Sequence, residues 1–99
     1  MIVSSVRARI VKDTPGAVEW SHGIAAFVKK KTGNQVDVLV RIGATQDVVW
    51  LQRFPDLAAY EKAFTAMQAD AEYHSLVKSA QDKGYFDPVN LEAGIWRQL

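Results

Sequence analysis

Apolar and polar residues alternate along four stretches of this sequence, which is the pattern of β-strands buried on one face. The four stretches are residues 2–11, 35–44, 48–54 and 90–99. In the first, every second residue from Ile2 to Ile10 falls on one face. The second and third are separated by the polar residues TQD, and two such runs joined by a short polar turn predict a β-hairpin.

The register of this hairpin is predicted from the side chains that would face one another. Pairing Ile42 with Val48 also places Asp37 opposite Arg53. Opposite charges at paired positions stabilise a sheet, so this register is favoured. A shift by one residue would instead place Arg53 opposite Val38, and we therefore expect the first register.

Helical spacing of apolar residues is found between the first and second predicted strands. The residues that recur are Ala17, Trp20, Ile24, Phe27 and Val28. Thr14 is expected to cap this helix with Pro15 in its first turn, where the missing N–H is tolerated. Gly33 is expected to end it in the left-handed conformation.

A second helical segment covers residues 55–84. Its apolar stripe drifts partway along, and its members are Leu57, Tyr60, Phe64 and Met67, followed by Tyr73, Leu76, Val77 and Ala80. Asp56 is expected to cap the start, and Asp70 is a plausible second cap. We therefore expect a kink or break near Ala69 and Asp70, and an end at Gly84.

The element order is βαββαβ, and it predicts one ferredoxin-like α+β domain over residues 1–99. Such a domain has a four-stranded antiparallel sheet with both helices on one face. The other face would carry Arg7, Arg9, Leu39, Arg41, Val49, Leu51, Arg53 and Trp96. That set is too apolar to face water alone and too charged for a packed core, so we expect a second copy of the sheet to cover it as a homodimer.

Charge and composition narrow the classes of partner. Twelve basic and eleven acidic residues give a net charge of +1, so neither a nucleic acid nor a membrane partner is expected. The basic run at residues 29–31 lies at a predicted helix C-terminus, where it complements the helix dipole. The absence of cysteine excludes disulfides and thiolate chemistry. No signal peptide pattern and no apolar run of about 20 residues is seen, so a cytoplasmic protein is expected.

The run VVWLQRFPDLAAYEKAFTAMQADAEYHSLV, residues 48–77, resembles the third strand and second helix of the dimeric α+β barrel superfamily. In those proteins a strand ends in an aromatic residue, and a capped helix of the type "laayeaal…adpey…l" follows. Members include antibiotic-biosynthesis monooxygenase-like, NIPSNAP-like and stress-responsive barrel proteins. The resemblance implies a homodimer whose sheets face each other, with a cavity between each sheet and its helices or partner. It fixes no activity, because the superfamily includes enzymes and proteins with no known activity.

His74 and Tyr73 are the candidate catalytic residues, with few features to support them. In haem-degrading members of the superfamily, a helix histidine ligates the haem, together with a strand asparagine and a helix tryptophan. Here the first strand offers Ser4 and no asparagine, Met67 stands near the tryptophan position, and His74 falls about a turn too early. These departures argue against haem, and no cofactor is expected. On the helical wheel His74 lies at the edge of the buried side, so a rim histidine without a catalytic task is favoured.

Metal binding is not expected either. His22 falls toward the polar side of the first helix, and the two histidines lack the spacing of metal ligands.

The candidate ligand-binding residues lie on the predicted second sheet face. They are Arg7, Arg9, Arg41, Arg53 and Trp96. Buried arginines need partners, and Asp37, Asp47 and Glu92 are available. An arginine left over would favour an anionic or carbonyl-bearing ligand. The slightly favoured alternative is that these arginines form interface ion pairs or lie in water on edge strands. Cofactor-independent oxygenases of the superfamily bind planar aromatic compounds in a cavity lined by residues such as tryptophan, which makes Trp96 a candidate, while Trp50 is expected in the core.

Two functions of different classes remain open. The first is a small monooxygenase-like enzyme that acts on an aromatic or anionic compound without a bound cofactor. The second is a dimeric ligand-binding or stress-response module with no enzymatic activity. The sequence does not select between them.

Overall fold

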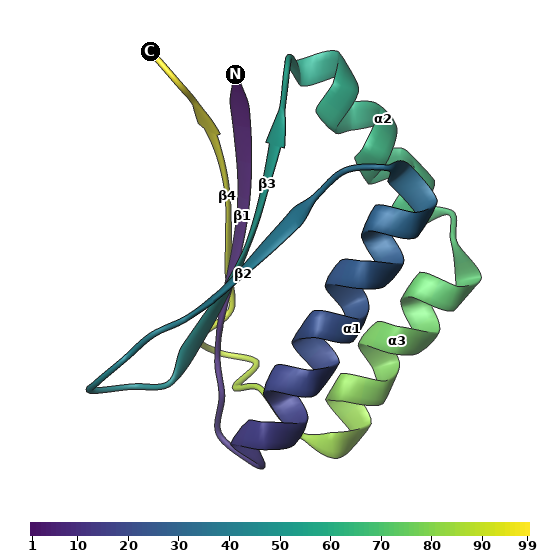
Figure 1. Cartoon of the computed structure of the whole chain (residues 1–99). Helices are drawn as coiled ribbons and strands as arrows, with labels where there is room; N and C mark the ends of the chain where they lie inside the picture. Colours follow the sequence, from purple (N-terminus) through teal and green to yellow (C-terminus); the bar gives the residue numbers. More distant parts are fainter.

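The computed structural model describes all 99 residues, and its elements follow the order βαββααβ (Figure 1). The strands are β1 (Ile2–Arg9), β2 (Val36–Val40), β3 (Asp47–Phe54) and β4 (Glu92–Arg97), and the helices are α1 (Thr14–Thr32), α2 (Leu57–Gln68) and α3 (Ala71–Lys83). The strands form one antiparallel sheet in the order β2-β3-β1-β4. All three helices cover the same face of this sheet (Figure 1). The predicted ferredoxin-like α+β fold is confirmed.

The predicted hairpin register is wrong by two residues. Val48 lies opposite Val40, where Ile42 was expected, and Asp37 lies opposite Leu51. The reason is the length of the turn: β2 ends at Val40, and the backbone N–H of Arg41 donates to the carbonyl of Asp47 at 2.8 Å. Ile42 therefore belongs to the loop, where it is 99% exposed. A shift of two residues leaves every side chain on its predicted face, because side chains alternate with a period of two.

The cap of α1 differs from the prediction by one residue. Asp13 is the cap, and its Oδ1 accepts a hydrogen bond from the backbone N–H of Gly16 at 3.2 Å. Thr14 is the first residue of the helix itself. Asp13 has a φ of 49°, a left-handed conformation that aspartate adopts more readily than most residues. Gly33 ends the helix with a φ of 76°, as predicted.

The second helical segment is divided at the predicted place. Asp56 caps α2 through the N–H of Ala59 at 2.8 Å, and Asp70 caps α3 through the N–H of Tyr73 at 2.9 Å. Each carboxylate satisfies an N–H that the first helical turn leaves without a partner. Gly84 ends α3. The break lets α2 and α3 take different directions over the sheet (Figure 1).

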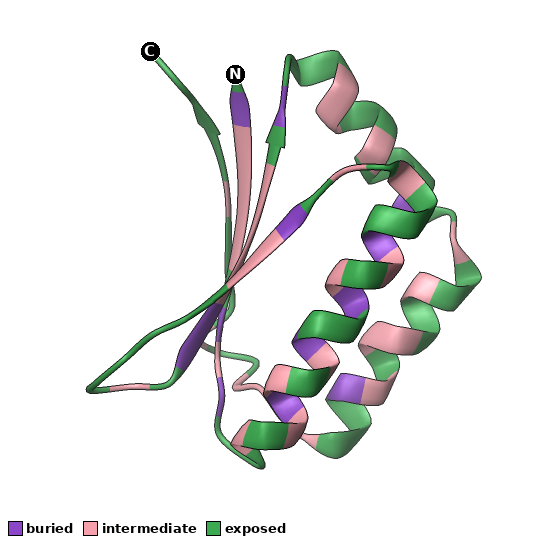
Figure 2. Ribbon diagram, viewed as in Figure 1, coloured by how far each residue is buried: buried purple, intermediate pink, exposed green.

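The core lies between the sheet and the helices, and the buried residues of α1 are on the side that faces the strands (Figure 2). Trp50 of β3 packs there as predicted, with its ring edge-on to Trp20 at 6.1 Å and to Phe86 at 5.6 Å. The Trp20 indole also donates to the carbonyl of Leu76 at 3.0 Å, which joins α1 to α3. The predicted stripe of α2 is only partly buried: Met67 is covered, but Phe64 is 51% exposed. No helix has the length and apolar character needed to cross a membrane.

We call the side of the sheet that faces the helices the helix face, and the other side the open face. The helix face carries Ser4 and Val6 of β1, Val36 and Val38 of β2, Trp50, Gln52 and Phe54 of β3, and Ile95 of β4. The open face carries Ser5, Arg7 and Arg9 of β1, Asp37 and Leu39 of β2, Asp47, Val49, Leu51 and Arg53 of β3, and Glu92 and Trp96 of β4.

Candidate functional site

A cavity of about 310 Å³ lies between the helix face of the sheet and α2. Its lining comes from β1, β3 and β4 on one side, and from α2, the last turns of α1 and the start of α3 on the other. The apolar lining includes Val28, Phe54, Phe64, Met67 and Ile95. The polar side chains of the lining are those of Ser4, Thr32, Gln52, Tyr60, Gln68 and Tyr73. A mostly apolar hollow with a few polar groups is the usual composition of a small-molecule site.

Small side chains explain why this part of the domain stays hollow. Ser4 of β1 and Ala93 of β4 project from the sheet here, and Ala63 of α2 lines the opposite side. The second half of the domain has bulky rings instead, where Trp20, Trp50 and Phe86 meet edge-to-face. The core is therefore filled beneath α1 and α3 and open beneath α2.

One wall of the cavity is aromatic. The Tyr60 ring lies edge-on to Phe54 at 5.5 Å and stacks on Phe64 at 5.8 Å with an angle of 29°. Phe64 and Ile95 are each 51% exposed, so the cavity opens to solvent between α2 and the edge strand β4. Flat rings and an apolar mouth suit a planar aromatic ligand.

Some polar side chains of the lining have hydrogen-bond partners in the protein, and others have none. Gln52 accepts a hydrogen bond at its Oε1 from the side-chain amide of Asn34 at 3.1 Å, and the Thr32 hydroxyl donates to the carbonyl of Val28 at 2.8 Å. The Ser4 hydroxyl has no hydrogen-bond partner in the protein. Burial raises the pKa of the Tyr73 hydroxyl above its ordinary value of 10.0, so this group remains a protonated donor at neutral pH.

The two candidate catalytic residues are neighbours in sequence but lie in different environments. Tyr73 is half-buried and lines the cavity. His74 is exposed and is not part of the lining; its Nε2 donates to the carbonyl of Gln68 at 2.7 Å, at the C-terminus of α2. His22 is also exposed, on α1. No three histidine, aspartate or glutamate side chains gather closely enough to hold a metal ion.

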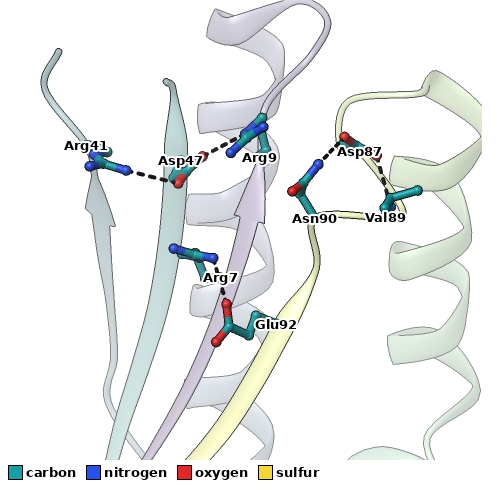
Figure 3. Close-up of polar contacts among 8 residues, drawn as sticks. All are labelled: Arg7, Arg9, Arg41, Asp47, Asp87, Val89, Asn90 and Glu92. Carbon is teal, nitrogen blue, oxygen red and sulfur yellow. Dashed lines mark hydrogen bonds and ion pairs between the residues drawn. The ribbon is translucent and has the colours of Figure 1, made fainter. Parts of the chain in front are cut away.

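The predicted arginine cluster lies on the open face, on the other side of the sheet from the helices. The Arg7 guanidinium pairs with Glu92 at 2.6 Å, and that of Arg53 pairs with Asp37 at 2.5 Å (Figure 3 shows the Arg7 pair). These are partners that the sequence suggested. Both pairs are largely exposed.

Arg9 and Arg41 share a single carboxylate. The Asp47 side chain lies between them, with its two oxygens 3.5 Å from Arg9 Nε and 3.6 Å from Arg41 Nη1 (Figure 3). Asp47 itself is buried, whereas both arginines are partly exposed.

Asp87 is a further acid close to Arg9 (Figure 3). Hydrogen bonds from the backbone N–H of Val89 and the amide of Asn90 hold the pKa of Asp87 below its ordinary value, and the charge of Arg9 lowers it further.

Trp96 also lies on the open face. The residue is 61% exposed, and its indole N–H donates to the Ser5 hydroxyl at 2.9 Å. The predicted ligand-binding residues are thus gathered on one surface, and that surface is separated by the sheet from the cavity side chains of the helix face. Sequence reasoning missed Ser4 and Gln52. The signal was present, because both are polar residues at strand positions whose neighbours on the same face are apolar.

Comparisons with known proteins bear on the fold. No protein-family model and no curated protein matches the sequence. Among solved structures, a NIPSNAP domain protein from Burkholderia xenovorans has a TM-score of 0.79 at 13% identity, covering 100% of this chain and 95% of that one. SnoaB, a cofactor-independent oxygenase from Streptomyces nogalater, has a TM-score of 0.75 at 13% identity, covering 99% and 92%.

A third similar structure is described as a putative antibiotic biosynthesis monooxygenase, from Deinococcus radiodurans. Its TM-score is 0.74 at 11% identity, and the alignment covers 100% of this chain and 93% of that chain. Identities this low show a shared fold and leave the activity of this chain open. The chain therefore has the fold of these NIPSNAP and antibiotic-biosynthesis-monooxygenase structures, as the resemblance of residues 48–77 implies.

Proposed function

We propose that the cavity beneath α2 binds a planar aromatic compound bearing a phenol or carbonyl oxygen, and that the protein is a monooxygenase-like enzyme that uses no bound cofactor. The observation that carries the proposal is the cavity itself: about 310 Å³, with an aromatic wall at Tyr60 and a few hydrogen-bond donors at Ser4, Gln52 and Tyr73. The fold that it shares with SnoaB, a cofactor-independent oxygenase, adds support.

The proposed reaction draws its electrons from the substrate. A phenol that is oxidised to a quinone takes one oxygen atom of O₂ into the new carbonyl, and the other leaves as water with two hydrogen atoms of the substrate. In this scheme the phenol loses four electrons and O₂ gains four, so no external reductant is needed. Tyr73 would donate a hydrogen bond to the ligand oxygen, and the apolar lining would bury the ring and exclude water.

The test uses 1-naphthol as the probe. With the enzyme, O₂ uptake should accompany the appearance of 1,4-naphthoquinone in equal amounts. Ala63→Phe places a ring in the cavity and should abolish binding and turnover. Ala58→Phe is the matched control, since Ala58 lies on the same helix, is exposed and is not part of the lining. If both variants bind 1-naphthol as the unmodified protein does, the cavity is not the site.

A ligand-binding module without enzymatic activity is the alternative function. In that case 1-naphthol would still bind, and Ala63→Phe would still abolish its binding. The rate of O₂ uptake would be the same with the protein as in buffer alone.

We also propose that the protein is a homodimer joined through the open face, and that this face is a second candidate site. Two guanidinium groups share the one carboxylate of Asp47, so Arg9 and Arg41 have donors to spare for an anionic compound held between two sheets. Calorimetric titration of benzoate into Arg9→Ala and Arg41→Ala tests this. If an arginine contacts the ligand, its replacement by alanine should weaken binding by about 1–3 kcal/mol. If its role is purely structural, the replacement should lower only the melting temperature.

A further inference from the structure

Gln52 is a polar side chain on the helix face of β3, between Trp50, whose ring lies in the packed core, and Phe54, whose ring lines the cavity. It is half-buried and lines the cavity. Its Oε1 accepts a hydrogen bond from the Asn34 side-chain amide at 3.1 Å. Asn34 lies in the connection between α1 and β2, outside the cavity lining, and its own backbone N–H donates to the Thr32 hydroxyl at 3.2 Å.

In the arrangement of this hydrogen bond, the NH₂ end of the Gln52 amide remains free. A glutamine amide has one acceptor oxygen and one donor NH₂ group. Asn34 occupies the oxygen, and no protein group accepts a hydrogen bond from the NH₂. Ser4 lies directly opposite Gln52 in the pairing of β1 with β3, and its hydroxyl also has no protein partner. Two neighbouring donors on the sheet side of the cavity are therefore unused.

We infer that Gln52, oriented by Asn34, selects ligands that present a hydrogen-bond-accepting oxygen to the sheet side of the cavity. This inference rests on the proposed function, and it adds which atom of the ligand is recognised and from which side. Gln52 contacts the ligand directly. Asn34 is a positioning residue, since it acts only by fixing the amide of Gln52.

The selectivity follows from the desolvation of the amide. A ring that enters the cavity removes water from the Gln52 NH₂, which is unfavourable unless the ligand supplies an acceptor. A ligand that presents an N–H there would place donor against donor. Sites built around a fixed donor discriminate in this way against ligands of similar shape that lack an acceptor.

Three planar two-ring compounds of similar size separate these cases. Chromone presents a carbonyl oxygen, naphthalene presents no polar group, and indole presents only an N–H donor. Binding is measured by titration of ¹⁵N-labelled protein followed by NMR, in which the side-chain NH₂ signals of Gln52 and Asn34 report their own contacts. The unmodified protein should bind chromone about three- to tenfold more tightly than naphthalene, with indole weakest.

Substitutions at Asn34 test the positioning role without touching the cavity. In Asn34→Asp the carboxylate can only accept, so Gln52 must turn its NH₂ toward residue 34 and present its oxygen to the cavity. Indole should then bind more tightly than chromone. Asn34→Ala leaves the Gln52 amide free to rotate, and the ratio of the affinities for chromone and naphthalene should fall toward one. Gln52→Met keeps the length of the side chain, removes both polar groups, and should also abolish the preference.

The outcomes separate this inference from the proposed function. If none of the three compounds binds, both are overturned. If the compounds bind but the order of affinities is the same in the unmodified protein and all three variants, the role of Gln52 and Asn34 is wrong while the aromatic site stands. A preference for indole in the unmodified protein also overturns the inference. Reversal of the order in Asn34→Asp alone, with loss of preference in the other two variants, supports it.

Discussion

Arg53 and Asp37 form an ion pair on the open face although they are not paired with each other in the register of β2 and β3. Asp37 is opposite Leu51, and Arg53 is opposite Val3, yet Arg53 Nη1 lies 2.5 Å from Asp37 Oδ2. A long arginine side chain can span the diagonal between neighbouring strands. The same charge pair therefore fits two registers that differ by two residues, and it could not identify the correct one.

A contrast between two carboxylates of the open face gives the first prediction. Asp47→Asn removes a buried charge that two arginines share, and it should lower the free energy of unfolding by about 1–3 kcal/mol. Asp37→Asn disrupts one exposed pair and should lower it by less than about 1 kcal/mol. Urea unfolding of both variants provides the measurement. Equal effects would mean that the burial of Asp47 does not strengthen its contacts.

The cap between α2 and α3 gives the second prediction. Asp70→Ala leaves the N–H of Tyr73 without its acceptor and should lower the free energy of unfolding by about 1 kcal/mol. Asp70→Asn is the matched control, because an amide oxygen still accepts at this position, and it should retain most of the stability. Urea unfolding distinguishes them, and an alanine variant as stable as the asparagine variant would show that the cap is unimportant.

Local signals in the sequence predicted most of the fold. The alternation of apolar residues assigned each strand residue to its face, and the carboxylates of Asp56 and Asp70 located both helix starts. The hairpin register was missed because a shift of two residues preserves the faces. It depends on whether Arg41 and Ile42 extend β2 or belong to the turn, and the apolar alternation continues through Ile42 in either case.

The candidate site was predicted only in part. The open face and the carboxylate partners of its arginines could be derived from periodicity and charge. The cavity could not, because it depends on where α2 lies over the sheet, and on small residues such as Ser4 and Ala63 that come together only in the folded chain. Gln52 was detectable as a polar residue on an apolar face, but its link to Asn34 depends on the path of the connection after α1.

The burial of Tyr73 gives a prediction about pH. Its pKa is raised in the folded protein above the ordinary 10.0, so in alkali the unfolded chain loses this proton first. Stability is then unaffected by this group below pH 10.0 and falls as the pH rises above it. Tyr73→Phe should show a smaller fall over the same range. Urea unfolding at alkaline pH tests this, and an identical fall in both proteins would contradict it.

His74→Ala should change the free energy of unfolding by less than about 1 kcal/mol, because the side chain is exposed and makes one hydrogen bond, to the carbonyl of Gln68. Turnover of 1-naphthol should stay within a small factor of that of the unmodified protein. A hundredfold loss with folding intact would show that His74 is a working acid, base or ligand despite its position outside the cavity.

The proposed homodimer is tested on the open face. Leu39 lies there, 53% exposed, between the ion pairs of the sheet, and a second sheet would cover it. Sedimentation equilibrium at micromolar concentration should give twice the chain mass of 11.0 kDa. Leu39→Asp would place an unpaired charge in the interface and should shift the equilibrium to the monomer. Leu57→Asp is the control, because Leu57 is similarly exposed at 44% but lies on α2, on the other side of the sheet.

A cooperative unfolding transition from a species of 11.0 kDa in the unmodified protein would rule out the dimer, and with it any anion site between two sheets. That result would leave the proposal for the cavity beneath α2 standing, because the cavity lies on the helix face of the sheet and the anion site lies on the open face.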